Sequence, residues 1–214
     1  MTAAELIAQF TDGMKATTGP EYIAVVTGIA SVWFSKRENI LVYPVGLINT
    51  TIYIWLSYQG QLFGEATVNL YYTVMSIYGW WQWSRRTTSQ EHVLHIRFSD
   101  ARWWRYQLLF FAGMYLLLYF ILLQVQQGFA PGAIPWADAL ASASAFTGMW
   151  LMTRKKVESW YWWLLTNTVS IPLYFSKQYV FTSVYYFILL LLAVAGLRAW
   201  RQKARTPLYA HGSP

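Results

Sequence analysis

Apolar stretches of membrane-spanning length recur along the chain, and short polar or charged segments separate them. A helix of about 20 apolar residues crosses a bilayer, so the pattern predicts an all-α, polytopic membrane bundle of seven transmembrane helices. The first stretch is short for a span and would need its flanking residues. The seven stretches are approximately Tyr22–Phe34, Ile40–Leu56, Leu62–Trp83, Tyr106–Val125, Trp136–Met152, Trp160–Phe175 and Tyr179–Trp200.

The N-terminal residues 1–18 carry a narrower apolar stripe. Its members are Leu6, Ile7, Phe10 and Met14. Their helical spacing predicts a short amphipathic helix that lies at the membrane surface. A signal peptide is not expected, because Glu5 stands where a basic start is usual and no long apolar core follows.

Composition supports the membrane class and excludes several chemistries. Hydrophobic residues make up 56% of the chain and charged residues only 12%. The chain has no cysteine, and its histidines lie in a polar loop (His92, His95) and in the tail (His211). We therefore expect neither a metal nor a redox cofactor. The net charge of +7 does not indicate a nucleic-acid partner, because the basic residues gather at the ends of apolar stretches.

Basic residues alternate sharply between the two sides of the predicted bundle. The connections after the first, third, fifth and seventh stretches hold Lys36 and Arg37; Arg85, Arg86, Arg97, Arg102 and Arg105; Arg154, Lys155 and Lys156; and Arg198, Arg201, Lys203 and Arg205. The opposite side holds only Lys15 and Lys177. The positive-inside rule then places the N-terminus outside and the C-terminus inside, and an odd number of spans is required.

An internal repeat divides the chain. A shift of 118 positions places Ser35-Lys36-Arg37 on Thr153-Arg154-Lys155 and Asn49-Thr50 on Asn167-Thr168; after a one-residue gap, Gly79 falls on Gly196 and Trp83 on Trp200. Residues 19–86 and 135–203 are therefore predicted to be three-helix repeats of the same orientation, a 3+1+3 parallel arrangement. Residues 87–134 would form a cytoplasmic loop and a linker helix, and residues 204–214 a cytoplasmic tail.

The segment Trp160–Tyr174 carries the main candidate site, because the polar Asn167 lies in the middle of an apolar span. Helical spacing places Trp160, Trp163 and Tyr174 on the same face as Asn167. An alternative is that Asn167 only bridges helices and that the tryptophans form an interfacial belt. The repeat places Asn49 opposite Asn167 near mid-membrane, which favours a lined site.

The end of the third span adds Trp80 and Gln82 to the candidates. An aromatic belt at the cytoplasmic boundary is the competing interpretation for the tryptophans of this segment. Asp138 and Glu65 lie at the outer ends of the fifth and third spans. Both are compatible with charges at helix N-termini, which stabilise a helix without binding anything.

The motifs resemble those of PnuC, the bacterial nicotinamide riboside transporters. The resemblance covers about residues 20 to 203 and rests on Trp80-x-x-Trp83 after Tyr78-Gly79, on Trp163-x-x-x-Asn167, and on the repeat. It implies a full-length architecture similar to the SWEET sugar transporters, assembled as a homotrimer in the bacterial inner membrane. It also implies facilitated diffusion of nicotinamide riboside, with a cytoplasmic kinase that phosphorylates the riboside and traps it.

The candidate residues suit this substrate, a cationic pyridinium with a carboxamide and a ribose. Aromatic faces attract a flat cation, and amides both donate and accept hydrogen bonds. We assign polar recognition to Asn167, Asn49 and Gln82, and stacking or gating to Trp163, Trp160, Tyr174, Trp80 and Tyr53, with Asp138 as an electrostatic attractant.

Other functional classes account for fewer of these features. The spans contain no nucleophile with an acid–base partner and no metal cluster, so we do not expect an enzyme. A structural scaffold leaves the paired asparagines unexplained, and a channel leaves the stacked aromatics unexplained. A SWEET-like uniporter for a sugar or another nucleoside is the nearest alternative, and coupling to an ion stays open.

Overall fold

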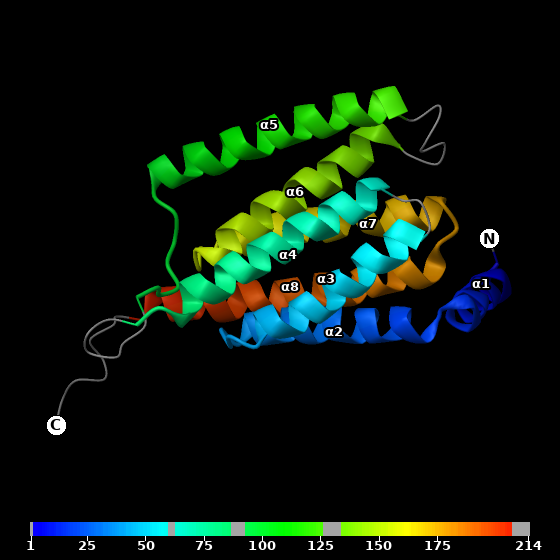
Figure 1. Cartoon of the computed structure of the whole chain (residues 1–214), viewed down its shortest axis with the longest axis horizontal. Helices are drawn as coiled ribbons and strands as arrows, with labels where there is room; N and C mark the ends of the chain where they lie inside the picture. Colours follow the sequence, from blue (N-terminus) through cyan, green and yellow to red (C-terminus); the bar gives the residue numbers. More distant parts are fainter. Residues whose placement is uncertain (1, 60–62, 87–92, 126–133, 207–214) are drawn as a thin grey trace.

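The computed structural model describes residues 2–59, 63–86, 93–125 and 134–206. The named elements within these ranges are all helices, and an isolated parallel bridge joins Arg97 and Lys156. The all-α prediction is confirmed for the described residues. A short helix precedes seven longer ones (Figure 1). The helices are α1 (Ala3–Ala16), α2 (Gly19–Lys36), α3 (Val42–Gln59), α4 (Phe63–Ser84), α5 (Ala101–Val125), α6 (Pro135–Thr153), α7 (Ser159–Ser176) and α8 (Val180–Arg205).

Local sequence sets several of these helix ends. Thr2 and Glu5 form a capping box at the start of α1, in which the Thr2 backbone N–H donates to Glu5 Oε2 at 2.9 Å. Three helices end alike, on a non-glycine residue with left-handed backbone: Glu38 after α2, Lys155 after α6 and Gln178 after α7, with φ of 62°, 52° and 64°. At each, two backbone N–H groups turn back to the last helical carbonyls, as in a Schellman motif.

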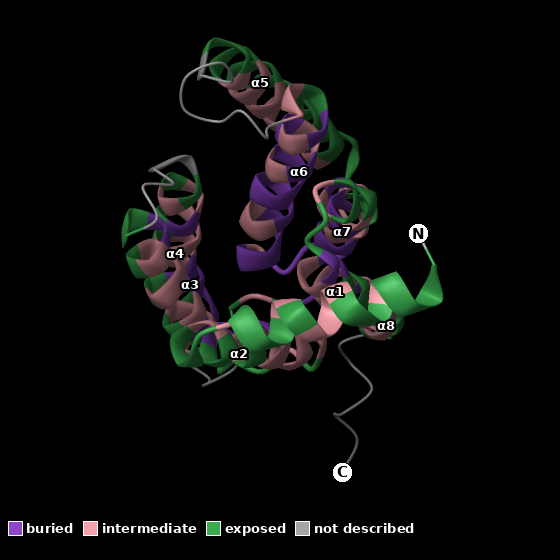
Figure 2. Cartoon of the chain, turned by 90° about the vertical axis from the view of Figure 1, so that its right-hand side faces the viewer, coloured by how far each residue is buried: buried purple, intermediate pink, exposed green. Residues whose placement is uncertain are grey.

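The seven longer helices form two groups and one peripheral helix. The first triplet (α2, α3, α4) and the second triplet (α6, α7, α8) each pack in chain order, and the triplets meet where α2 contacts α8 and α4 contacts α6. Helix α5 packs against α6 at the periphery (Figures 1 and 2). Helix α1 lies against α8 and has no buried residue.

The same glycine–aromatic packing occurs in both triplets. The Tyr43 ring lies over Gly79 and meets Trp83 edge-on, with ring centroids 5.1 Å apart at 84°. In the second triplet the Trp160 ring lies over Gly196 and meets Trp200 edge-on, at 5.6 Å and 86°. Each glycine is needed because any side chain would occupy the space of the facing ring.

Recurring hydrogen bonds place the internal correspondence at 117 positions rather than 118. The Asn49 side-chain amide donates to the Ala24 carbonyl at 2.6 Å, and the Thr166 hydroxyl donates to the Ala141 carbonyl at 3.3 Å. These bonds pair Asn49 with Thr166, so the predicted equivalence of Asn49 and Asn167 is displaced by one residue. The same spacing of 117 separates Glu38 from Lys155 and Gly79 from Gly196, so no gap between the motifs is needed.

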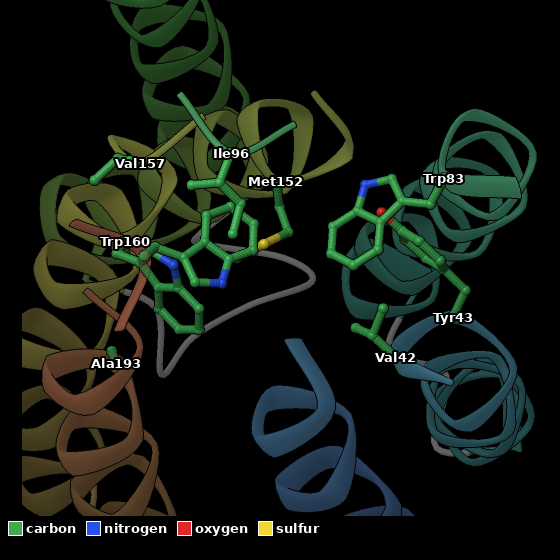
Figure 3. Packing of buried hydrophobic residues seen from close by; sticks show 9 residues of the cluster. Val42, Tyr43, Trp83, Ile96, Met152, Val157, Trp160 and Ala193 are labelled. Carbon is green, nitrogen blue, oxygen red and sulfur yellow. The ribbon is translucent and has the colours of Figure 1, made fainter. Parts of the chain in front are cut away.

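Nine buried apolar residues close one end of the bundle (Figure 3). They are Val42, Tyr43, Trp83, Ile96, Met152, Val157, Trp160, Ala193 and Trp200, here called the aromatic cluster. Trp83 of the first triplet and Trp200 of the second have ring centroids 6.1 Å apart. The cluster therefore joins the triplets at the end that carries most of the basic residues.

A shared carboxylate joins the triplets beside the aromatic cluster. Glu38 Oε1 lies 2.8 Å from Lys155 Nζ, and Glu38 Oε2 lies 2.8 Å from Lys203 Nζ. Burial alone would raise the pKa of Glu38, but the hydrogen bonds from the two lysines outweigh it and the pKa is lowered. Burial lowers the pKa of Lys155, which has only this one carboxylate as a partner. Glu38 is thus held ionised between two cations.

Among the described residues, two helices are long and apolar enough to qualify as membrane spans on their own. These are Ala101–Gln124, with a mean hydropathy of 2.0, and Val180–Arg205, with a mean hydropathy of 2.3. The other predicted spans contain more polar side chains, such as Asn49 in α3 and Asn167 in α7. Large apolar side chains are nevertheless exposed on several of these helices, for example Ile48, Val74 and Ile77.

We predict that Gly196→Ala destabilises the protein, because its Cβ would overlap the Trp160 indole. Overpacking of this kind costs about 1–3 kcal/mol. Gly113→Ala in α5 is the matched control, since nothing lies within 4 Å of the added Cβ and alanine is the better helix former. Thermal unfolding of the purified protein in detergent measures both. Equal unfolding temperatures for Gly196→Ala and Gly113→Ala would contradict the packing described.

Candidate functional site

Five tyrosines gather where the two triplets face each other: Tyr53, Tyr72, Tyr174, Tyr185 and Tyr186, here called the tyrosine cluster. They come from α3, α4, α7 and α8, and all are half-buried. Tyr174 stacks on Tyr186 with centroids 5.1 Å apart, and Tyr185 meets Tyr186 at 5.6 Å. Tyr72 and Tyr53 lie within electrostatic range of Tyr185 and Tyr186. The cluster therefore presents aromatic faces from both triplets.

Asn167 lies one helical turn from an aromatic partner of this cluster. Trp163, on the same face of α7, lies 6.4 Å from Tyr72 between ring centroids and packs against Gly148. The Asn167 side chain is only 3% exposed and forms no hydrogen bond with any described residue. A buried amide without partners costs free energy. Asn167 is thus placed to bond something that the protein itself does not supply.

The side chains of Asn49 and Tyr185, a member of the tyrosine cluster, both lie next to Gly28. An added Cβ on Gly28 would lie 2.9 Å from the Asn49 amide nitrogen and would overlap the Tyr185 hydroxyl. Gly28 therefore makes room for both polar groups. One N–H of Asn49 is used by the Ala24 carbonyl, which leaves the Asn49 carbonyl oxygen without a partner among the described residues.

Three predicted site residues are placed elsewhere. Gln82 is engaged within α4, where its Nε2 donates to the Tyr78 hydroxyl at 2.8 Å and its Oε1 accepts from Arg85 at 3.4 Å. Trp160 is 1% exposed within the aromatic cluster. Trp80 is 41% exposed and has no ring contact with a described residue. The structure does not bring these side chains together with Asn167 and the tyrosines.

The two acidic residues near the outer ends differ in their partners. Asp138 binds Lys177 through both oxygens, at 3.0 and 3.1 Å, and accepts the Ile134 N–H at 2.6 Å. Glu65, in the first turn of α4, is exposed and lies within electrostatic range of Tyr53, Tyr174 and Tyr186. It forms no ion pair with a described residue. Glu21 is likewise without an ion pair among the described residues and lies within electrostatic range of Tyr53, but only Glu65 is near three members of the tyrosine cluster.

Sequence reasoning did not select Tyr72, Tyr185, Tyr186 or Glu65. The adjacent pairs Tyr71-Tyr72 and Tyr185-Tyr186 inside apolar spans were an available signal, because a hydroxyl in a membrane helix needs a partner. Among the described residues, no group of three His, Cys, Asp or Glu side chains is arranged to hold a metal ion.

Comparison with known proteins assigns this arrangement to a family. The family described as "Nicotinamide mononucleotide transporter" matches residues 19–202. The chain belongs to this family. The match includes every helix from α2 to α8 except the last residues of α8. Family membership agrees with the expectation of a membrane transporter rather than an enzyme.

Two curated relatives are named as transporters of different compounds. The chain is 27% identical over 205 residues to the nicotinamide riboside transporter PnuC of Escherichia coli, with 86% of each chain covered. It is 25% identical over 186 residues to the riboflavin/roseoflavin transporter RibM of Streptomyces davaonensis, with 86% of this chain and 85% of the relative covered. The resemblance to PnuC that the motifs indicated is confirmed.

A solved structure supports the fold. The crystal structure of the vitamin B3 transporter PnuC matches with a TM-score of 0.65 and 20% identity, and the match covers 96% of this chain and 93% of that one. Agreement over nearly the whole length shows that the helices are arranged as in that transporter.

Proposed function

We propose that this protein carries nicotinamide riboside into the bacterial cytoplasm. The observation that carries the proposal is the buried Asn167, whose side-chain amide forms no hydrogen bond with a described residue and which lies one helical turn from Trp163, the ring partner of Tyr72. Relatives named as nicotinamide riboside transporters support it. The substrate offers a carboxamide to the amide and a flat cation to the rings.

The chemistry of the site matches this substrate. Stacking of a pyridinium on tyrosine or tryptophan contributes up to about 2 kcal/mol when both are desolvated. The Asn167 amide can donate to the substrate carbonyl and accept from its NH₂ group. Asn49 and the tyrosine hydroxyls would then form hydrogen bonds with the ribose. Gln82, Trp160, Trp80 and Asp138 remain candidates, for gating rather than for first contact, and the unpaired Glu65 is the stronger electrostatic attractant.

The architecture we propose is seven membrane spans in a 3+1+3 parallel repeat. The reciprocal contacts of α2 with α8 and of α4 with α6, and the repeated glycine–aromatic packing, favour an axis along the membrane normal between the triplets. Basic residues at one end favour an outside N-terminus and a cytoplasmic C-terminus. The homotrimer and the SWEET-like relationship rest on the family resemblance alone.

Facilitated diffusion is the transport mode that we propose. The helices contain no acid–base pair at mid-membrane among the described residues, and Asp138 is already paired with Lys177. Net uptake would then require that free riboside is removed from the cytoplasm. Phosphorylation by a cytoplasmic kinase would remove it.

Riboflavin is the second candidate substrate, because RibM is also a relative and its flat ring would suit the same aromatic faces. A sugar or another nucleoside, as for a SWEET-like uniporter, is the third. Uptake of labelled nicotinamide riboside into proteoliposomes, challenged with each unlabelled compound, separates these. The proposal fails if riboflavin or a sugar competes and nicotinamide riboside does not.

Asn167→Leu should nearly abolish riboside binding and leave the fold intact. Leucine removes both hydrogen-bonding groups at similar volume, and the unpaired substrate groups cost about 1–3 kcal/mol, so Kd rises by roughly one to two orders of magnitude. The control is Asn69→Leu, because the Asn69 amide is already bonded to the Glu65 carbonyl in its own helix. Isothermal titration with the riboside compares the two. A folded Asn167→Leu protein that binds like wild type would disprove the site.

Uptake should increase with an inside-negative membrane potential and need no proton or sodium gradient. A monovalent cation gains about 2.3 kcal/mol per 100 mV on crossing to a negative interior. Proteoliposomes with an imposed potassium diffusion potential provide the measurement. Uncharged riboflavin should not respond to the potential, so the same experiment distinguishes the two substrates. A requirement for either gradient would rule out uniport.

The protein should carry nicotinamide riboside but reject its mononucleotide, although the family description names the mononucleotide. A phosphate moved into the bundle without a basic partner is an uncompensated charge. The lysines nearest the ends of the pathway are already paired, Lys177 with Asp138 and Lys155 with Glu38. Competition against labelled riboside, with phosphatases excluded, tests this. Equal competition by the mononucleotide would mean that one of these pairs opens to receive phosphate.

A further inference from the structure

The segment between α4 and α5 crosses the basic end of the bundle and is bonded to the turn between α6 and α7. The Arg97 N–H donates to the Lys155 carbonyl and the Val157 N–H donates to the Arg97 carbonyl, both at 3.1 Å. Ser99 donates to Glu158 Oε2 from its backbone N–H at 2.9 Å and from its hydroxyl at 2.7 Å. Residues 93–99, here called the crossing segment, are therefore attached to the second triplet.

The crossing segment inserts one side chain into the aromatic cluster. Ile96 is 8% exposed and belongs to the aromatic cluster, whose other members come from both triplets. In Figure 3, Trp83, Tyr43 and Val42 lie on one side of the cluster, while Ile96, Met152 and Trp160 lie on the other. Ile96 thus fills the second-triplet side of the cluster at this end.

Polar contacts join the same two sides around the cluster. Besides the pairs of Glu38 with Lys155 and Lys203, the Ser35 hydroxyl lies 3.0 Å from Met152 Sδ. The Trp200 indole N–H donates to the Ser35 carbonyl at 3.0 Å. The turn after α2 is therefore fastened to the turn after α6 and to α8, so this end of the bundle is closed.

The closed end leaves buried polar atoms without partners. They are the Tyr43 hydroxyl and the indole N–H groups of Trp83 and Trp160. Such groups normally find a hydrogen bond in a folded protein, and water or a passing substrate would supply one if the two sides separated. Lys155 Nζ also lies 4.8 Å from the Trp83 ring centroid, so it occupies an aromatic face that a cationic substrate could use.

We propose that the turn after α2 and the turn after α6, fastened by Glu38 and Lys155 and covered by Ile96, form the cytoplasmic closure of the transport pathway. This rests on the proposed transport function. Release of substrate to the cytoplasm requires the two turns to separate. The crossing segment stays bonded to the second triplet, so that Ile96 moves with that triplet and away from the side that holds Trp83 and Tyr43.

The natural absence of cysteine makes a cross-linking test direct. The test variant combines Glu38→Cys with Lys155→Cys, and a short, reducible bis-methanethiosulfonate links the two thiols across the triplets. The matched control is Arg97→Cys with Lys156→Cys, because these residues form the bridge that attaches the crossing segment to the second triplet. Adjacent bridged strands lie about 4.8 Å apart, which suits a disulfide. Mass spectrometry establishes the yield of each cross-link.

Two readouts are used: binding of labelled nicotinamide riboside to the purified protein, and uptake into proteoliposomes. The cross-linked Glu38–Lys155 pair should bind with unchanged Kd but lose uptake to the level of protein-free liposomes, and reductant should restore it. The cross-linked Arg97–Lys156 pair should keep its uptake. Uptake that survives a complete Glu38–Lys155 cross-link would overturn the closure, and so would failure of that pair to cross-link.

Loss of uptake in the control pair would show that the crossing segment moves on its own, and would overturn the coupled movement. A wild-type protein that neither binds nor transports the riboside would instead refute the proposed function. The two failures are therefore distinguishable in one set of measurements.

Discussion

Burying a polar group in an apolar bundle costs free energy unless that group has a partner, and most of the buried polar groups in this protein have one. Lys155, almost fully buried, has Glu38; Asp138 has Lys177 and a backbone N–H; Gln107 accepts the indole N–H of Trp162. Asn167 forms no hydrogen bond with a described residue, and Gln107 Nε2 and several polar atoms of the aromatic cluster are unpaired as well. Asn167 differs from these atoms in its place on the helix face of Trp163, whose ring lies 6.4 Å from that of Tyr72, and there its amide can bind a ligand.

Glycine and aromatic rings provide the second constraint. Gly79 and Gly196 let Tyr43 and Trp160 approach the backbone of a neighbouring helix, and both rings then meet a tryptophan edge-on. Such contacts hold helices together where the surrounding solvent is as apolar as the side chains and the hydrophobic effect is weak. The same geometry occurs in both triplets, and Trp83 of the first triplet meets Trp200 of the second at 6.1 Å between ring centroids.

Much of the fold was predictable from the sequence, because long apolar stretches indicate the helices and basic connections mark where those helices end. Every predicted stretch contains most of one observed helix, for example Trp160–Phe175 within Ser159–Ser176. The repeat stays a prediction, and the hydrogen bonds of Asn49 and Thr166 indicate that its register was one residue off around Asn49. Three Schellman turns at Glu38, Lys155 and Gln178 lack the usual glycine, so nothing in the sequence located the turns that set the register.

The candidate site was less predictable, because helical spacing gives a face but not its neighbour. Trp160 and Asn167 were placed on one face, yet Trp160 is covered by Gly196 and Trp200, which come from α8. Asp138 was selected for its charge, and its partner Lys177 lies 39 residues away in the chain. Tyr185 and Tyr186 were passed over because tyrosine in an apolar stretch is compatible with a membrane-interface belt.

The contacts between the two triplets differ at the two ends of the bundle. Around the aromatic cluster, the hydrogen bonds and ion pairs that cross between the triplets involve Glu38, Ser35 and Trp200. Near the tyrosine cluster, the side-chain hydrogen bond from the first triplet to the second is that of the Tyr71 hydroxyl with the Phe146 carbonyl. The basic end is held by charge and the opposite end mainly by stacked rings. A cation that stacks on those rings would strengthen the end held by rings, whereas separation of the triplets at the basic end would have to break the pairs of Glu38 with Lys155 and Lys203.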